Sequence, residues 1–485
     1  MERFFMGSNI KKNYIYNVSF QIFVLLIPFI TTPYISRILQ ADGVGMYSYA
    51  NSIATYFSLM AALGLSSYGI REVSRVRDSK RRASKLFWEL SIIRLVSTAV
   101  CFLLYLGFIL LTGSDMRIYL ASGIVILTVG VDCSWFFQAL ENFKALTIRN
   151  FAVKIISTIC IFLFVKTEND LLLYILIHTG GTLLANLVMW SQLRAWLVRV
   201  SWRRLSFHRH IKETLIYFVP TIATSVYTVL DRTMIGVITK DMNQNGYYEQ
   251  AHKIVNMLMT VITSLNVVVG VRTSYLFGKN KEEEIRGHIQ NTFRFMFMIS
   301  MPLAAGLIAC ADGFVPWFFG PGYDQVALML MMFAPLLFII GTSNVLGSLY
   351  LTPSGQRARS NNAIIAGAAC NVVLNLVLIR LLKGYGAVIA SVVAELLISA
   401  LYLSYSRKFI SIATVLKQAL RYAALALAMF VPTFLIGRVL PPGMEKTLVQ
   451  VAVGVATYAV LLIVTRDPAW LECKKILLSK FKKNT

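Results

Sequence analysis

The stretch from Leu95 to Leu111 reads LVSTAVCFLLYLGFILL and contains no charged residue. A helix that crosses the hydrocarbon core of a bilayer, which is about 30 Å thick, needs roughly 20 mainly apolar residues. With the residues before it, this stretch forms a mainly apolar segment over 86–111, longer than the apolar runs that soluble core helices sustain. It therefore predicts a transmembrane helix, and runs of the same kind recur along the chain.

The composition of the whole chain agrees with this interpretation. Of the 485 residues, 57% are hydrophobic and 14% are charged, and the mean hydropathy is +0.65. A soluble domain carries about 25% charged residues to cover its surface. We therefore predict an all-α polytopic membrane protein with about fourteen transmembrane helices. The expected spans are 14–38, 43–68, 86–111, 117–139, 145–165, 170–193, 213–238, 250–277, 289–311, 325–351, 360–382, 384–405, 415–437 and 447–465.

The net charge of +24 would suggest nucleic acid as the partner of a soluble protein, but here it has another explanation. If the N-terminus is cytoplasmic and the spans alternate, the inside loops receive about 32 of the 47 basic residues and the outside loops about 8. Such a bias is the positive-inside rule. It predicts that both termini are cytoplasmic, and that the basic connection 69–85 lies against anionic headgroups of the membrane lipids. We expect no nucleic-acid partner.

A weak internal repeat divides the chain. The segments Gly45–Ile53 and Gly246–Ile254 share Gly, Tyr, Ala and Ile in register, although a chance match of a few residues is an alternative. The pattern predicts two parallel six-helix units, an arrangement found in transporters with a substrate path at the repeat interface. The expected parts are an N-terminal half over 1–193, a basic connection over 194–212, a C-terminal half over 213–405, and two further helices with a basic tail over 406–485.

Polar side chains recur at helical spacing on spans of both halves. Ser and Thr often serve only to hydrogen-bond neighbouring helices in membranes, but the same pattern in both halves favours one central polar cleft. The residues expected to line this cleft are Asn51, Thr224, Thr228 and Asn256.

Within or near the spans, basic residues outnumber acidic ones. A charge inside a bilayer must face protein or a water-filled cavity, and arginine forms bidentate bonds with phosphate oxygens. A cationic cleft for an anionic ligand is therefore expected. Its candidate residues are Arg37, Arg149, Lys154, Arg232, Lys253 and Arg272. Arg37 and Arg272 lie near span ends, where reaching to the membrane interface is an alternative role.

Three intramembrane carboxylates are candidates for ion coupling: Asp132, Asp231 and Glu395. Glu395 falls near the middle of its span, although a purely structural partner is an alternative for it. No cofactor is expected, while coupling to a proton or sodium gradient is possible for these residues. The six cysteines show no metal-ligand spacing, and His208 and His210 stand on a basic loop without a third ligand. No G-x-x-x-x-G-K-[ST] loop for nucleotide occurs.

Three motifs resemble one family. They are TPYISRILQADGVGMYSYA over Thr32–Ala50, LDRTMIG over Leu230–Gly236 followed by Gly246-Tyr-Tyr, and NVVLNLVLI over Asn371–Ile379 followed by GYGA over Gly384–Ala387 and Ala394-Glu395. They resemble Wzx-type O-antigen and polysaccharide flippases, the polysaccharide-transporter branch of the multidrug/oligosaccharidyl-lipid/polysaccharide exporter superfamily. The resemblance runs from about residue 10 to about residue 465. The family's usual proline after Ile379 is Arg380 here, which puts a local bend in question.

The resemblance implies a non-enzymatic function. Members of this family move undecaprenyl-diphosphate-linked oligosaccharide from the cytoplasmic to the outer leaflet of the bacterial plasma membrane. They do so by alternating access, for the synthesis of O-antigen, capsule or exopolysaccharide. A polysaccharide polymerase and glycosyltransferases would be the neighbouring partners. A diphosphate agrees with the cationic cleft inferred from the residues.

Two alternatives remain at this level. A sister exporter of drugs or of another lipid-linked precursor would share the fold, although the excess of buried cations speaks against cationic drugs. A polytopic polymerase or ligase would usually carry a long outward loop with acidic or histidine residues. The longest outward loop expected here, near Asp312–Asp324, is short and holds no Lys, Arg or His.

The charge bias gives a first prediction. A reporter fused after Thr485 will be active only if it functions in the cytoplasm, because six basic residues between Arg466 and Lys483 hold that end inside. The same reporters fused at Gly113, in a loop expected outside, serve as the control and will show the opposite pattern. An externally active C-terminal fusion would contradict the topology.

Overall fold

The computed structural model describes residues 2–113, 115–279, 281–472 and 474. Within these ranges, side chains are described except at 2–26, 204, 216–217, 219–228, 264–272, 274–275 and 278. The chain divides into two compact units, Met1–Gly246 (unit 1) and Tyr247–Thr485 (unit 2). Over the described residues the regular structure is helical, as the composition predicts.

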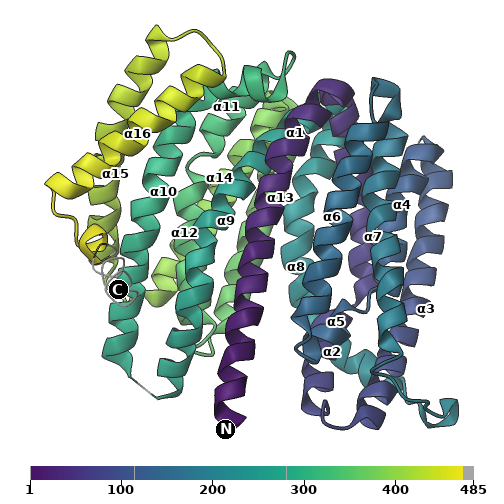
Figure 1. The fold of residues 1–485 in the computed structure, drawn as a ribbon. Helices are drawn as coiled ribbons and strands as arrows, with labels where there is room; N and C mark the ends of the chain where they lie inside the picture. Colours follow the sequence, from purple (N-terminus) through teal and green to yellow (C-terminus); the bar gives the residue numbers. More distant parts are fainter. Residues whose placement is uncertain (1, 114, 280, 473, 475–485) are drawn as a thin grey trace. The chain divides into compact units, whose positions relative to one another are not determined.

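Unit 1 contains eight α-helices and the start of a ninth (Figure 1). Their bounds are α1 Glu2–Ala62, α2 Leu65–Arg75, α3 Lys80–Thr112, α4 Met116–Val131, α5 Ser134–Ala139, α6 Phe143–Phe164, α7 Leu171–Leu193 and α8 His208–Thr239. Short 3₁₀ turns lie at Glu168–Asp170 and Trp202–Arg204. The ninth helix, α9 (Met242–Gly278), begins in unit 1 and continues in unit 2.

Unit 2 continues with seven further α-helices. They are α10 Glu282–Phe319, α11 Asp324–Phe333, α12 Leu336–Leu346, α13 Arg357–Leu382, α14 Gly384–Ser406, α15 Ile412–Val439 and α16 Met444–Val464. A π-helical turn follows α12 at Gly347–Leu351. The two spans expected after the second half, α15 and α16, both pack on α10. Gln450 on α16 donates to the Ala309 carbonyl of α10 at 2.9 Å.

All fourteen expected spans fall on helices, but several boundaries differ from the prediction. The first two spans form one helix, α1, which is interrupted only at Gln40 (φ 54°, ψ −179°). The second span ends at Ala62 rather than at 68, because Leu63 and Gly64 adopt positive φ angles of 47° and 68°. The fourth span is divided into α4 and α5 at Asp132. Helix α13 runs through Arg380 without a break.

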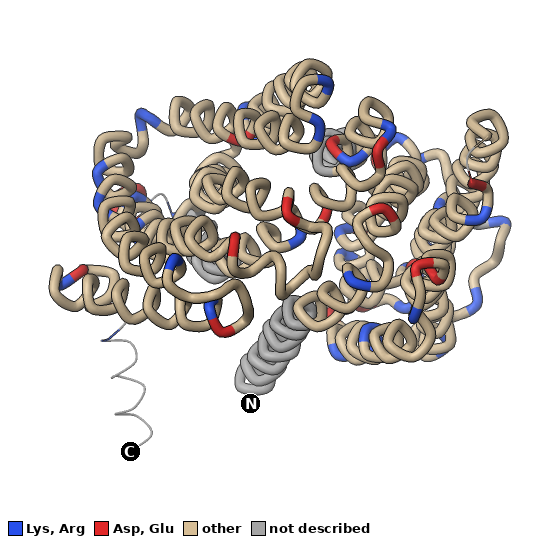
Figure 2. Tube along the Cα trace, turned by 90° about the horizontal axis from the view of Figure 1, so that it is seen from above, with Lys and Arg blue, Asp and Glu red and all other residues tan. Residues whose placement is uncertain are grey.

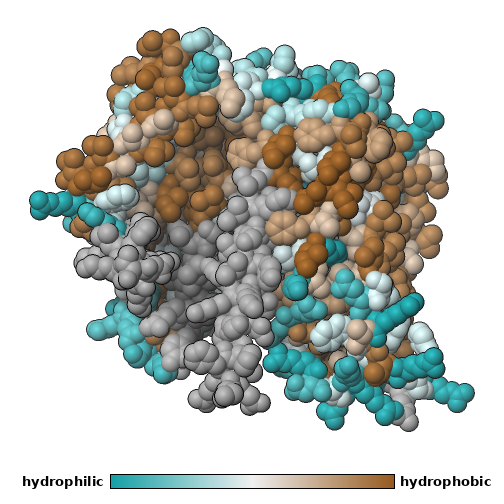
Figure 3. All heavy atoms as spheres, in the orientation of Figure 1, coloured by the Kyte–Doolittle hydropathy of each residue, from teal (hydrophilic) through white to brown (hydrophobic). Residues whose placement is uncertain are grey.

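Eleven helical segments in the described part of the chain are long and apolar enough to cross a membrane. One of them, Ile27–Arg75, joins parts of the first two expected spans, while α8 and α9 include stretches whose side chains are not described. The count of fourteen therefore stays a prediction. Figure 3 shows hydrophobic side chains over much of the visible face, whereas hydrophilic ones gather at the lower end of unit 1.

The basic connection 69–85 is not an irregular loop. Its first part belongs to α2, which is amphipathic: Leu65, Tyr68 and Val73 are buried, while Arg71 and Arg75 face outward. Gly69 lets this helix approach α5 closely, since a Cβ on Gly69 would lie 2.5 Å from the Trp135 ring. The outward arginines leave α2 suited to the headgroup region expected from the sequence.

A buried polar triad joins segments that are far apart in the sequence. His210 in the first turn of α8 lies 3.0 Å, through Nε2, from Glu89 Oε2 on α3. Its Nδ1 lies 2.9 Å from the Tyr68 hydroxyl on α2, and Glu89 Oε1 also accepts the Ser206 backbone N–H at 2.6 Å. His210 is thus a buried residue in the first turn of a helix, whereas the sequence placed it on a basic loop, and it ties α8 to α2 and α3.

This triad gives a stability prediction. His210→Ala will leave the buried Glu89 carboxylate without its histidine partner, at a cost of about 1–3 kcal/mol of unfolding free energy. Thermal unfolding of the purified protein in detergent measures the change. His208→Ala, an exposed position two residues earlier, is the matched control and will leave the midpoint unchanged. Equal midpoints for the two variants would show that the triad does not stabilise unit 1.

Candidate functional site

A polar interface joins the second expected span to α8 inside unit 1. Thr233 Oγ1 of α8 lies 2.9 Å from Ser52 Oγ and 3.0 Å from the Tyr56 hydroxyl, both on α1. Asp231, beside Thr233, is buried, and Arg232 is half-buried. Both charged residues interact electrostatically with Tyr56. The Leu230–Gly236 motif therefore meets the polar face of the second span.

The other expected cleft residues are placed as follows. Asn51 is half-buried on α1, next to Ser52, and its carbonyl accepts the Thr55 hydroxyl. Arg37 is exposed near the end of the first span. The side chains of Thr224, Thr228 and Arg272 lie outside the described residues. Lys253 and Asn256 belong to unit 2, so the structure does not place them relative to Arg232.

Two glycines at equivalent positions of the repeat allow a very close backbone contact. A Cβ on Gly45 would lie 1.8 Å from the Met242 carbonyl oxygen, and a Cβ on Gly246 would lie 2.0 Å from the Ala41 carbonyl oxygen. The two contacts are related by the register of the repeat, which pairs Gly45 with Gly246 and Ala41 with Met242. Reciprocal contacts of this kind are what a two-fold relation between similar segments produces.

A non-glycine residue with a positive φ angle precedes each of the two segments. Gln40 has a φ of 54° and Lys240 a φ of 55°, a region that few side chains adopt. Their ψ angles differ, however, at −179° for Gln40 and 19° for Lys240, and the repeat register pairs Gln40 with Asp241. The glycine contacts therefore support the register while these turns do not, and the division into six-helix halves stays a prediction.

A second cluster of charges lies between α3, α4 and α6 of unit 1. Buried Arg94 donates to the Asp132 carbonyl at 2.7 Å and to Ser66 Oγ at 2.6 Å, and its Nη1 lies 3.3 Å from Asp132 Oδ2. Arg149 on α6 also interacts electrostatically with Asp132. Asp132, a candidate for ion coupling, is therefore ion-paired with Arg94 in this structure. Two arginines surround one carboxylate, so the cluster is net positive.

Arg149 and Lys154 differ in their surroundings, although both lie on α6. Arg149 Nη1 donates to Asn186 Oδ1 at 3.1 Å, and its Nε and Nη2 donate to Asn150 Oδ1 at 3.0 and 2.7 Å. Lys154 is half-buried and makes no hydrogen bond or ion pair with another described residue. Five residues along a helix from Arg149, it points about 140° away.

In unit 2, α9 carries a polar row that sequence reasoning missed in part. His252 stacks on Tyr248 with ring centroids 5.7 Å apart, and its Nδ1 lies 3.0 Å from Asn256 Nδ2. Tyr248 also reaches Ser391 on α14, one turn before half-buried Glu395. The i, i+4, i+8 spacing of Tyr248, His252 and Asn256 would have identified His252 as a further titratable group on this face.

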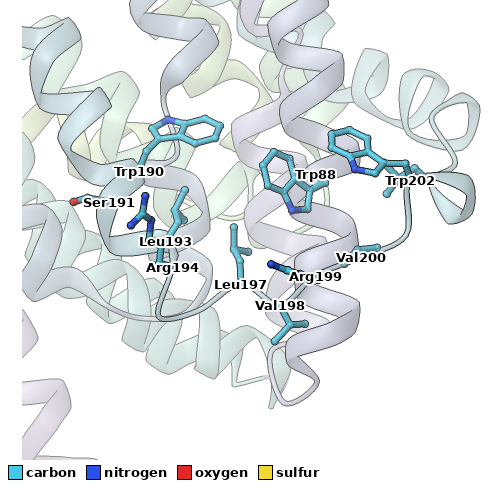
Figure 4. Close-up of a pocket in the computed structure, with 11 residues that line it drawn as sticks. Trp88, Trp190, Ser191, Leu193, Arg194, Leu197, Val198, Arg199, Val200 and Trp202 are labelled. Atoms are coloured by element: carbon cyan, nitrogen blue, oxygen red, sulfur yellow. The ribbon is translucent and has the colours of Figure 1, made fainter.

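A cleft rich in tryptophan opens at the end of unit 1 that carries the 194–212 connection. Trp88 of α3 lies between Trp190 of α7 and Trp202, with ring centroids 6.3 and 5.9 Å away. Figure 4 shows the three indoles along one edge of the cleft, and along the other the side chains of Arg194, Leu197, Val198, Arg199 and Val200. Tryptophan with arginine is typical of a membrane–water interface, so this end of unit 1 is expected to lie there.

Lys and Arg outnumber Asp and Glu in the chain, 47 to 23, and Figure 2 shows charged residues of both signs spread over many of the helices. Among the described residues, no three His, Cys, Asp or Glu side chains are grouped so that they could hold a metal ion.

Comparison with known proteins decides the family. A family profile described as polysaccharide biosynthesis protein matches residues 10–271, more than half of the chain. The chain belongs to this polysaccharide biosynthesis protein family. Two curated relatives, from Escherichia coli (strain K12) and Shigella dysenteriae, carry names that describe O-antigen transport. Each is 23% identical, over 82% and 77% of this chain and 97% and 94% of its own length.

Solved structures show the same fold. The lipid II flippase MurJ in an inward closed conformation superposes with a TM-score of 0.72 at 14% identity, covering 94% of this chain and 99% of its own. A multidrug transporter of the MATE family gives 0.58 at 12% identity, covering 81% and 99%. The all-α transporter fold and the family recognised in the sequence are thus confirmed. The family members compared are transporters, so the polytopic enzyme is set aside.

The reciprocal glycine contact predicts whether a Gly→Ala substitution raises or lowers the free energy of unfolding. In an open helix, Gly→Ala stabilises by roughly 0.5–1 kcal/mol. Gly45→Ala and Gly246→Ala will instead destabilise by about 1–3 kcal/mol, because the added methyl overlaps a carbonyl oxygen. Gly107→Ala on α3, where a Cβ meets nothing within 4 Å, is the control. The midpoint of thermal unfolding in detergent measures the effect. The same midpoint shift in all three variants would contradict the contact.

Proposed function

We propose that this protein is a flippase of the bacterial plasma membrane. It moves an undecaprenyl-diphosphate-linked oligosaccharide from the cytoplasmic to the outer leaflet for the synthesis of a surface polysaccharide. The observation that carries this proposal is membership of the polysaccharide biosynthesis family over residues 10–271. A third relative, a low-salt glycan biosynthesis flippase of Haloferax volcanii, is 20% identical over 49% of this chain. It supports a lipid-linked glycan as the class of substrate.

The charges inside the units support an anionic headgroup. A diphosphate needs several hydrogen-bond donors with positive charge, and arginine supplies them in a fixed planar fork. Arg232 lies half-buried on α8, beside the interface of Thr233 with Ser52 and Tyr56 on the second span. A related exporter of cationic drugs would instead need an excess of buried carboxylates. We therefore keep the lipid-linked glycan and treat Arg232 and Lys253 as its diphosphate ligands.

Alternating access is the proposed mechanism, and the reciprocal glycine contact is its expected outer closure. With the N-terminus inside, the segments 41–45 and 242–246 follow the outer ends of the first and seventh spans. Their backbones touch where no side chain intervenes, so the closure has to separate before a headgroup can leave on that side. We propose Asp231 of unit 1 and His252 and Glu395 of unit 2 as the titratable groups that couple transport to a proton or sodium gradient.

A genetic experiment tests the transport function. In a strain that lacks the gene, the lipid-linked sugar of the corresponding pathway will accumulate on the cytoplasmic side, and the wild-type gene will restore surface polysaccharide. A surface polysaccharide that stays unchanged in the deletion strain would refute the function. Any polymerase and glycosyltransferases that cooperate with the protein would be sought in the same strain.

Arg232 gives the residue-level test. Arg232→Ala will remove a charge-assisted contact of about 1.5–3 kcal/mol and will reduce glycan export while membrane abundance holds. Arg232→Lys will recover only part of the export, because an ammonium cannot reproduce the guanidinium fork. Export and abundance are measured together, since loss of an ion pair with a neighbouring acid would lower abundance instead.

Two further variants complete this test. Arg380→Ala, an exposed arginine at the end of α13, is the matched control and will export normally. The Arg232→Ala, Lys253→Ala double variant will export less than either single variant. Normal export from an abundant double variant would end the assignment of these residues to the diphosphate.

A further inference from the structure

A groove between α6 and α7 of unit 1 combines an apolar floor with a cationic end. Its volume is about 620 Å³. The floor is made of small residues, Ala145 and Ala152 on α6 with Gly181 and Ala185 on α7. Exposed aliphatic side chains form the walls, and no acidic side chain lines the groove. The lining therefore suits a narrow apolar chain rather than a polar ligand.

The polar residues of the groove gather where α6 begins and α7 ends. Lys144 and Arg149 lie in the first two turns of α6, and Gln192 lies in the last turn of α7. The far end of the groove, at Ser157 and Gly181, carries no charge. The groove thus has one basic end and an apolar remainder, which matches an amphiphile with an anionic headgroup and an apolar chain.

The Arg149 side chain is held in place by two asparagines, Asn150 and Asn186. Buried Asn186 anchors it, since the Asn186 amide donates to the Thr128 carbonyl at 3.0 Å while its Oδ1 accepts from Arg149. The partners of Arg149 among the described residues are two neutral amides. The carboxylate that acts on it electrostatically, Asp132, is ion-paired with Arg94. A half-buried guanidinium without a carboxylate of its own favours an anion, above all a phosphate.

The length of the groove limits the chain that fits it. From Arg149 to Ser157 the helix rises about 12 Å at 1.5 Å per residue, close to half of a hydrocarbon core of about 30 Å. This depth suits one acyl chain of a single leaflet. The undecaprenyl chain of the proposed substrate is much longer and would leave most of its length outside.

From these observations we infer that the α6–α7 groove binds one anionic phospholipid of the surrounding leaflet, with its phosphate on Arg149 and Lys144 and an acyl chain along the floor. This site is separate from the transport path and does not depend on the proposed flippase function. It makes the protein's stability or activity responsive to the anionic lipid content of the membrane.

Lipid binding to the full-length protein tests this site. The protein is purified in a neutral detergent and titrated with dioleoyl phosphatidylglycerol or with dioleoyl phosphatidylcholine, and bound lipid is counted by native mass spectrometry. We expect the anionic lipid to bind more tightly. Arg149→Gln will weaken its binding about ten-fold or more and bring it to the level of the zwitterionic lipid. Lys166→Gln, at the other end of the α6 segment, is the charge-matched control and will bind like wild type.

A second variant guards against misfolding of the first. Ala152→Trp fills the groove from an exposed position and leaves Arg149 with its asparagines, so it will reduce binding of the same lipid without removing a charge. Undecaprenyl phosphate is the competing probe and is expected to leave bound phosphatidylglycerol in place. Displacement by it would overturn the assignment in favour of the carrier lipid. Unchanged binding in both variants would overturn the site itself.

Discussion

Backbone hydrogen bonding in hydrocarbon is the constraint on which the rest of this structure depends. A peptide N–H or C=O exposed to lipid has no water to bond, so each span must satisfy its own backbone as a helix. The consequence is visible at the interruptions. Gln40, Gly64 and Lys240 break the helices where apolar runs end, and the break at Asp132 is accompanied by side-chain contacts: the Asp132 carbonyl accepts from Arg94, and its carboxylate accepts the Ser134 backbone N–H at 3.0 Å. At Asp132, the irregular backbone is thus stabilised by a charged side chain.

The same constraint explains why the buried charged groups of unit 1 come in hydrogen-bonded sets. Glu89, His210 and Tyr68 form one set, and Arg94, Asp132 and Ser66 form another. A buried charge without a partner would cost several kcal/mol, so each set ties together the helices that contribute to it. The interface of Ser52, Tyr56 and Thr233 differs, because it is neutral and borders the buried Asp231 and half-buried Arg232. Neutral hydrogen bonds contribute less than hydrogen bonds to charged groups, so this interface is held less firmly than the two charged sets.

Arg149 shows how one charged residue can be read in two ways. Its residue type and its depth in the span suggested a role in a central cationic cleft. In the structure it is turned by Asn150 and Asn186 to the groove between α6 and α7, while Lys154 points about 140° away on the same helix. The two cations of α6 therefore serve different surfaces. A positive charge at the cytoplasmic side of a membrane protein can thus orient the chain, bind substrate or hold a structural lipid, according to its neighbours.

Sequence alone determined the fold class, the approximate position of the helices and the family, because hydrophobicity and helical period are local properties that persist along each span. It also suggested the register of the repeat, since Gly45 and Gly246 occupy equivalent positions in the two segments. The contacts that give the candidate site its shape were decided by tertiary structure. The sequence placed His210 on a basic loop, whereas in the structure α8 brings it to Glu89, 121 residues away in the chain. Likewise, no local pattern could show that Asn186 fixes Arg149, because that depends on which faces of α6 and α7 meet. Side-chain packing between distant segments selects among the many pairings that the same hydrophobic pattern allows.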